Sequence, residues 1–187
     1  LLPNTYVNWT NGTQENITFK TRGTYKKNID IFYRNASAGN WIYITSVSPG
    51  GDNANVTYPW YPPDDITLNA SIKVTTNETN PVINVNDTSD TEFRLKGAIL
   101  VTTPNGNDLW YVGETKQINW TSVGTVNPVK IEISNASGAA GTWKSINDSF
   151  AAATSGLNNY SWTVWGNISN ETCVIRITDT RAGFADV

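Results

Sequence analysis

The sequence repeats itself after about 100 residues, and this feature constrains the fold more than any other. Offsets of 100 to 103 positions align apolar and aromatic residues in the same order along the two halves. The aligned pairs include Trp9 with Trp110, Ile31 with Ile131, Trp60 with Trp162 and Ile72 with Ile175. Ordered matches with slowly changing offsets indicate two homologous modules that differ in loop length. We expect domains at residues 1–95 and 96–187.

Each module consists of short segments with alternating apolar and polar residues. In the second module, Ile118 and Trp120 alternate with Asn119 and Thr121, and three further segments behave in the same way. This period of two predicts antiparallel strands with one wet face, and no segment shows helical spacing. About seven such strands per module, with a tryptophan on an early strand, are typical of an immunoglobulin-like sandwich. The expected fold is all-β, with two tandem immunoglobulin-like antiparallel β-sandwich domains.

Asparagine unusually often begins an N-glycosylation triplet in this sequence. Fourteen of the 24 asparagines begin an Asn-x-Ser/Thr triplet in which x is not proline, whereas chance gives about five. This triplet accepts N-linked glycan, which exported and surface-exposed segments receive. The sequence therefore predicts an extracellular glycoprotein. The candidate acceptors are Asn8, Asn11, Asn16, Asn35, Asn55, Asn69, Asn77, Asn86, Asn119, Asn135, Asn147, Asn159, Asn167 and Asn170.

Triplets that lie on predicted strands also assign the two faces of the sheet. The asparagine and the hydroxyl residue are two positions apart and share the outer face, while the middle residue points inward. Five middle residues have the apolar or aromatic character that this requires. They are Ile17, Val56, Ala70, Trp120 and Tyr160. Other triplets fall in expected turns, such as the matching Asn-Ala-Ser loops at Asn35 and Asn135.

Net charge and cysteine content limit the classes of binding partner and the cellular location that we expect. The net charge is −3 with scattered basic residues, so neither nucleic acid nor a membrane surface is an expected partner. The longest apolar run, around Ala98–Val101, is far shorter than the about 20 residues that span a bilayer, which predicts no direct membrane insertion. Because Cys173 is the single cysteine, no intrachain disulfide can form, and a glycan-rich chain without disulfides favours a microbial surface, archaeal in particular.

The sequence offers little catalytic chemistry. It contains no histidine, and Cys173 falls at an expected inward strand position, where a thiol is usually inert. The carboxylate pairs Asp64/Asp65 and Asp87/Asp90 lie in expected turns and lack the spacing of a calcium-binding loop. We therefore expect no enzyme, no catalytic residue, no metal and no cofactor apart from N-linked glycans. Calcium at Asp87/Asp90 is the less favoured alternative.

The many aromatic residues raise the alternative of sugar binding by stacking. Most tryptophans recur between the modules or alternate inward, which predicts core packing. These are Trp41, Trp60, Trp110, Trp120, Trp143 and Trp162. The better candidates for a surface contact are Trp165 and Tyr61, at corresponding ends of one strand, and Trp9, near the N-terminus.

A family resemblance rests on motifs spread over about 90 residues of the second module. They are Pro104-Asn105-Gly106, Trp110, Gly113, Ile118-Asn119-Trp120, Gly124, Val129-Lys130-Ile131, Gly141-Thr142-Trp143, Tyr160-Ser161-Trp162 and Cys173-Val174-Ile175-Arg176-Ile177-Thr178-Asp179. With these motifs the module resembles the Ig-like repeat of large microbial surface proteins, and it is similar to the N-terminal module of fungal Ser/Thr-rich cell-wall proteins. The first module matches more loosely, because it is expected to lack an equivalent of the Gly113 turn. The resemblance implies spacers, stalks or wall-associated repeats, and no catalytic residue carries over.

The second module is expected to lack its last strand. Residues 86–95 predict a final hairpin strand in the first module, whereas the second stops at Val187, near the counterpart of Val85. A sheet without that strand would expose unpaired backbone and apolar core. Either the polypeptide continues, or a neighbouring subunit inserts a strand, for which Leu1–Trp9 is a candidate. Archaeal surface threads, which are glycosylated filaments of Ig-like subunits joined by strand donation, are similar in composition and architecture.

These observations favour a structural role. We expect a heavily N-glycosylated subunit or repeat unit of an extracellular filament or stalk at the cell surface, polymerised end to end with strand donation. Its partners would be neighbouring copies of itself, with cell-surface glycans as further partners. The alternative is a carbohydrate-binding or adhesion module that uses exposed aromatic residues such as Trp165.

Overall fold

The computed structural model describes residues 1–23, 27–76, 78–79, 82–83, 85–166 and 172–184. These residues form β-strands, turns and loops, and none of them belongs to a helix that could span a membrane. The contacts within the chain divide it into two compact units, Leu1–Lys96 and Gly97–Val187. The sequence placed the join one residue earlier, between residues 95 and 96.

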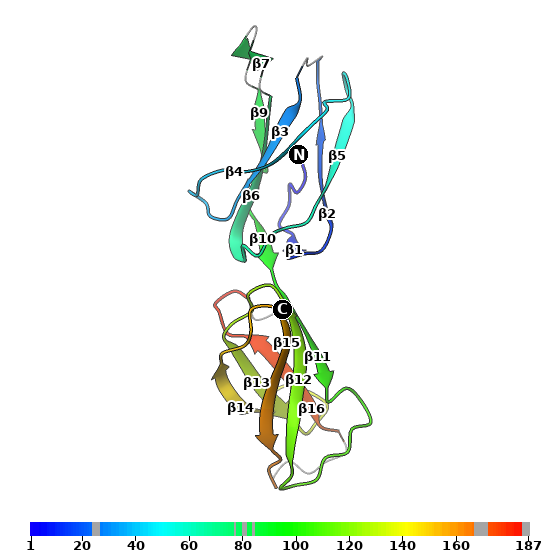
Figure 1. Ribbon diagram of the computed structural model, residues 1–187, viewed down its shortest axis with the longest axis vertical. Coiled ribbons are helices and arrows are strands. Elements are labelled where there is room, and N and C mark those ends of the chain that lie inside the picture. Colours follow the sequence, from blue (N-terminus) through cyan, green and yellow to red (C-terminus); the bar gives the residue numbers. More distant parts are fainter. Residues whose placement is uncertain (24–26, 77, 80–81, 84, 167–171, 185–187) are drawn as a thin grey trace. The chain divides into compact units, whose positions relative to one another are not determined.

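The first unit is a sandwich of two sheets (Figure 1). Its strands are β1 (Asn8–Thr10), β2 (Glu15–Lys20), β3 (Ile29–Arg34), β4 (Ile42–Val47), β5 (Asn55–Trp60), β6 (Thr67–Thr76), β7 (Glu78–Thr79), β8 (Val82–Ile83), β9 (Asn86–Thr88) and β10 (Phe93–Lys96). One layer pairs β2 with β5, and the other has the order β1-β10-β6-β3-β4, with β9 also on β6. The short strands β7 and β8 pair with each other in a separate two-stranded sheet. The pairs are antiparallel except for β1 with β10, which is parallel.

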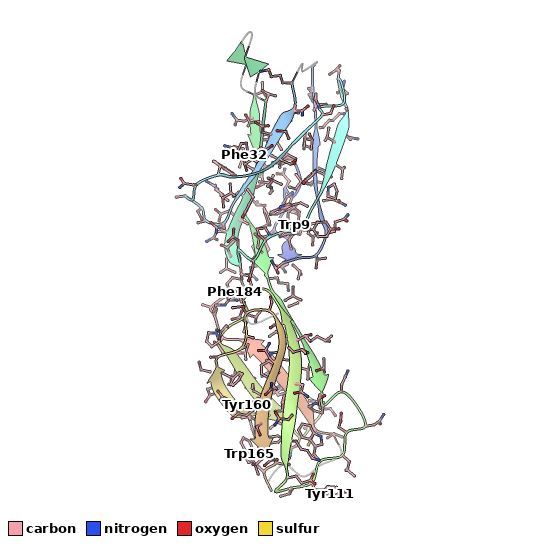
Figure 2. All side chains as sticks on the ribbon, viewed as in Figure 1. Trp9, Phe32, Tyr111, Tyr160, Trp165 and Phe184 are labelled. Atoms are coloured by element: carbon pink, nitrogen blue, oxygen red, sulfur yellow. The ribbon has the colours of Figure 1, made fainter. Side chains whose placement is uncertain are left out.

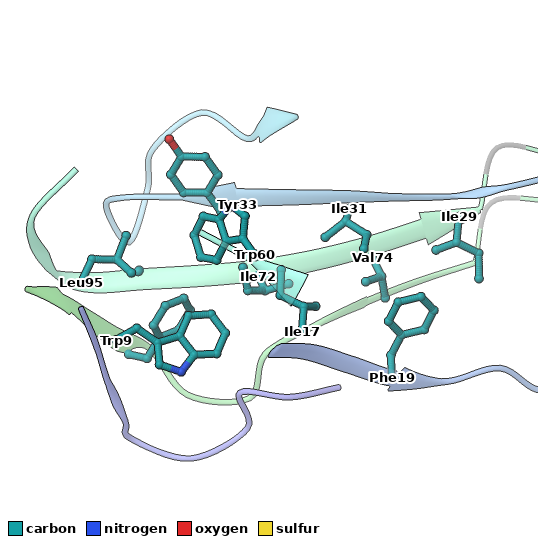
Figure 3. Packing of buried hydrophobic residues seen from close by; sticks show 12 residues of the cluster. Trp9, Ile17, Phe19, Ile29, Ile31, Tyr33, Trp60, Ile72, Val74 and Leu95 are labelled. Carbon is teal, nitrogen blue, oxygen red and sulfur yellow. The ribbon is translucent and has the colours of Figure 1, made fainter. Parts of the chain in front are cut away.

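The core of the first unit lies between these layers, because alternate residues of facing strands point inward. Ile17 of β2, Ile31 of β3 and Ile72 of β6 are fully buried. Figure 3 shows them in one cluster with Phe19 and Trp60. Burying a side chain of this size contributes about 1.5–3 kcal/mol relative to leaving it in water, so the alternation holds the two sheets together.

The described residues of the second unit repeat this plan with six strands. They are β11 (Ala98–Thr103), β12 (Thr115–Val123), β13 (Val129–Ser134), β14 (Trp143–Phe150), β15 (Gly156–Thr163) and β16 (Val174–Asp179). The sheets have the orders β11-β12-β15 and β14-β13-β16, and all pairs are antiparallel. Ile118, Trp120 and Ile131 are fully buried between them. The predicted fold class, two tandem immunoglobulin-like β-sandwiches, is confirmed.

The two units share a glycine turn that the sequence assigned to the second unit alone. Gly113 has a φ of 86°, and its N–H donates to the Val164 carbonyl at 2.9 Å. Gly12 has a φ of 67°, and its N–H donates to the Pro62 carbonyl at 3.0 Å. The prediction that the first module lacks this turn is wrong. Both turns need a positive φ, which glycine adopts without steric cost. Gly12 is also the middle residue of the glycosylation triplet that begins at Asn11.

Three tryptophans expected in the cores are only half-buried, namely Trp41, Trp110 and Trp143. Trp41 and Trp143 meet cations at the surface. The Arg34 guanidinium carbon and the Lys73 ammonium nitrogen lie 4.7 and 4.6 Å from the Trp41 ring centroid, and the Arg176 guanidinium carbon lies 4.0 Å from that of Trp143. These rings therefore gain cation–π contacts on the surface, and the prediction of core packing is wrong for them. It is confirmed for Trp60, Trp120 and Trp162, which are buried.

Candidate functional site

The structure describes eleven of the fourteen candidate acceptor asparagines, and each of these eleven has at least partial access to solvent. The exposed ones are Asn8, Asn16, Asn55, Asn69, Asn86 and Asn159. The half-buried ones are Asn11, Asn35, Asn119, Asn135 and Asn147. Asn77, Asn167 and Asn170 lie outside the described residues. The eleven therefore meet the positional requirement for glycan attachment, which is a site at the surface.

Strands position several of these asparagines through the alternation of their side chains. The middle residues Ile17 and Trp120 are fully buried, so the flanking asparagine and threonine of each triplet face away from the core. Ala70 is fully buried too, but its neighbour Ser71 is only 1% exposed, so Asn69 alone of that triplet is exposed, contrary to the expectation that both share an open outer face. The middle residues Val56 and Tyr160 are half-buried. Glycans on these strands would cover the outer faces of both sandwiches.

Turns position other acceptors at the surface. Asn35 and Asn135 begin equivalent loops, in which the Gly39 N–H donates to the Ala36 carbonyl and the Ala139 N–H to the Ala136 carbonyl, both at 3.0 Å. These matching loops were expected from the sequence. The acceptor loop is therefore part of the repeated architecture.

An apolar groove of about 800 Å³ lies at one edge of the second unit. Ile133 of β13, Trp162 of β15 and Ile175 of β16 line it from the core, and Trp110 lines it from the segment between β11 and β12. Among the described residues, β16 pairs with β13 alone, so its other edge offers backbone groups next to the groove. An unpaired strand edge beside apolar side chains can accept an additional strand.

The first unit fills the corresponding position with its own chain. There β10 lies between β6 and β1, and its Phe93 and Leu95 are fully buried. Trp9 of β1 is buried too, with its ring centroid 4.6 Å from that of Phe93. Its counterpart Trp110 is half-buried in a segment without a strand. The groove is thus the place that β10 occupies in the first unit.

Cys173 lines the same groove and is exposed, in contrast to the inward position that the sequence predicted. The residue directly precedes β16, which begins at Val174, so the alternation of that strand does not govern its orientation. The thiol is therefore accessible to reagents rather than sealed in the core.

The two carboxylate pairs take part in structural contacts. The Tyr33 hydroxyl donates to Asp65 Oδ2 at 2.6 Å, and burial, together with this carboxylate, raises the pKa of Tyr33. The Asp90 N–H donates to Asn4 Oδ1 at 2.9 Å, which ties the N-terminal segment to the turn before β10. Within the described residues, no cluster of three or more carboxylate or thiol side chains could hold a metal ion.

The aromatic surface candidates differ in exposure. Trp9 is buried, because β1 pairs with β10 and draws the ring into the core, so the prediction of a surface role for Trp9 is wrong. Trp165 is half-buried and meets Trp162 edge to face at 5.5 Å, at the same end of the unit as Tyr111 (Figure 2). Tyr61 is exposed, and its hydroxyl donates to Gln14 Oε1 at 2.8 Å.

A buried carboxylate on the outer face of β13 was missed at the sequence level. Glu132 is 6% exposed, and its carboxylate accepts from Lys130 at 2.9 Å and from Arg176 at 2.6 Å. Burial alone would raise the pKa of Glu132, but the hydrogen bonds and charges of Lys130 and Arg176 outweigh burial and lower it. The alternation of Lys130 and Glu132 was visible, whereas the pairing of Glu132 with Arg176 depends on register.

Comparison with known proteins gives no family assignment. No protein-family model matches the chain. No curated protein matches it either. Among solved structures, the fibronectin(III)-like modules of Clostridium thermocellum CbhA align with 96% of this chain and 84% of that chain, at 13% identity and a TM-score of 0.28. A TM-score this low supports no argument about fold or function.

Proposed function

We propose that the chain is a structural, heavily N-glycosylated subunit of an extracellular filament or stalk at a microbial, and in particular archaeal, cell surface. The observation that carries this proposal is the open edge of β16 beside an apolar groove, in a unit whose homologue within the same chain fills that place. The surface positions of the eleven described acceptors support the glycan coat.

Assembly proceeds by donation of a strand from a neighbouring copy into this groove. The arrangement in the first unit supplies the template, since β10 runs antiparallel to β6 and parallel to β1. A donated strand would run antiparallel to β16 and beside the segment around Trp110. Apolar residues two positions apart would then fill the groove, as Phe93 and Leu95 do in the first unit.

The N-terminal segment Leu1–Trp9 is the candidate for the donated strand. Leu1 and Val7 pack against the core of the first unit, and Trp9 belongs to that core. Donation of the whole segment Leu1–Trp9 would therefore take a tryptophan out of its own unit, at a cost of several kcal/mol. Leu1–Trp9 is therefore a donor only at this cost to the first unit.

A charge at the rim of the groove tests strand donation. Leu109 lines the groove and is 69% exposed, so Leu109→Arg should leave the fold intact and place a charge where an apolar strand must dock. We expect end-to-end assembly, measured by light scattering and electron microscopy, to fall at least tenfold. Leu157→Arg is the matched control, because Leu157 is an exposed leucine on β15 that does not line the groove. Equal assembly of the two variants would contradict strand donation.

The glycans would solvate the outer faces, screen strand edges from lateral association and block proteases. Enzymatic deglycosylation of the native protein tests this role. We expect the stripped protein to aggregate and to be digested faster than the untreated protein. If it stays soluble and equally resistant to protease, the shielding role is wrong.

A further inference from the structure

Two acceptor asparagines of the second unit face each other directly across a strand pair. Asn119 on β12 is the cross-strand partner of Asn159 on β15. Their neighbours Ile118 and Trp120 are fully buried, and Asn158 is buried, so both acceptors lie on the outer face of the sheet. Directly opposed residues of an antiparallel pair have Cβ atoms about 4.5–5.5 Å apart.

The homologous strands of the first unit carry the same kind of triplets in a different register. Asn16 on β2 faces Pro59, and Asn55 on β5 faces Lys20. The two asparagines are therefore offset by four residues, or about 13 Å along the strands. The hydroxyl residues meet instead, with 3.1 Å between the Oγ1 atoms of Thr18 and Thr57. Among the described residues, β12 and β15 thus hold an opposed pair of acceptors, whereas β2 and β5 hold a staggered pair.

We propose that Asn119 and Asn159 are mutually exclusive glycan acceptors, so that each folded molecule carries one glycan on this pair. This inference rests on the proposed function, which requires that the chain is N-glycosylated. The staggered pair Asn16 and Asn55 accepts a glycan on each asparagine.

Steric exclusion follows from the chemistry of attachment. A sugar activated by a phosphate leaving group forms a bond from its anomeric carbon to the side-chain nitrogen, while the carbon–oxygen bond to the phosphate breaks and the amide nitrogen loses one proton. The attached pyranose then stands over the opposed asparagine, because a ring with its substituents is wider than the separation of the two side chains. The transferase can no longer reach the second amide.

Counting glycans by intact mass on the full chain, produced in a host that glycosylates it, tests the proposal. Under exclusion, Asn119→Gln and Asn159→Gln each leave the number of glycans unchanged, because the remaining asparagine takes the sugar. The double variant loses one glycan. The staggered pair is the matched control: Asn16→Gln and Asn55→Gln each lose one glycan, and their double variant loses two.

Other results overturn the proposal. A loss of one glycan in each single variant and two in the double variant means that Asn119 and Asn159 are occupied together. A loss in only one of the single variants means that the other asparagine is never used. Thr121→Ala and Ser161→Ala erase the same triplets without changing the asparagines, and they must give the same counts. Absence of glycan from every position would overturn the proposed glycan coat as well, whereas joint occupancy overturns exclusion alone.

Discussion

Single residues on the outer faces stabilise the sandwiches through charge as well as packing. Glu132 is a buried carboxylate held by two cations, one of which, Arg176, also covers the Trp143 ring. A buried charge is tolerated only with such partners, since an unpaired one would carry a large desolvation cost. The three-residue arrangement therefore fixes the register of β13 against β16 from the solvent side.

Replacing Glu132 should lower stability in a pH-dependent way. The pKa of Glu132 is below its ordinary value of 4.5, so its contribution is present above that pH and is lost as the pH falls through the lowered pKa. We expect Glu132→Gln to reduce the free energy of unfolding by about 1–3 kcal/mol at neutral pH. The difference from wild type should shrink below about pH 4.5 in urea titrations. A difference that does not depend on pH would contradict this assignment.

The glycine turn that both units share gives a second prediction at the residue scale. Gly113 has a φ of 86°, and a Cβ there would meet no atom within 4 Å, so any cost of Gly113→Ala is conformational. We expect a loss of about 1 kcal/mol, measured by thermal or chemical unfolding. Gly51→Ala serves as control, because Gly51 has no positive φ and equally open surroundings. Similar losses in both variants would show that the turn geometry is not the cause.

At the scale of elements, the two units differ beside β6 and its counterpart β16. In the first unit β10 pairs with β6, whereas no described strand takes that place beside β16. In the first unit β10 is flanked by β1 and β6, and Trp9 is consequently buried. In the second unit the segment around Trp110 has no such partner among the described residues and forms no strand. The pairing partner, rather than the local sequence, thus decides whether this tryptophan segment is a strand.

A peptide should be able to stand in for the missing partner. A synthetic peptide with the sequence of Thr91–Lys96 carries the inward pair Phe93 and Leu95 of β10. We expect it to bind the second unit saturably and to change the fluorescence of Trp110 and Trp162, which line the groove. A peptide with serine at both apolar positions is the control, and equal responses to the two peptides would argue against the groove as a strand acceptor.

The sequence predicted the elements better than the individual surface residues. Alternation identified the inward residues Ile17, Trp120 and Ile131, because a strand with one buried face imposes a period of two. It failed for Cys173, which lies outside a strand, and for Trp41, whose cover comes from cations on other parts of the chain. The groove followed from counting strands, but its second wall, the segment around Trp110, required the structure.

For the whole molecule, the function that we propose is distributed over its surfaces. The described acceptors are spread over both units, and the groove belongs to the second unit alone. A subunit of the proposed filament needs a glycan-bearing exterior and one site that receives the next copy. Both requirements concern the outer faces and one sheet edge of the sandwich.

Electron cryo-microscopy of the assembled protein tests this account most directly. We predict a filament in which an extra strand from a neighbouring copy lies along the open edge of β16, with its apolar side chains in the groove beside Trp110 and Trp162, and with sugar density at surface asparagines. Particles that stay monomeric, or filaments in which this edge of β16 and the groove remain empty, would contradict the account.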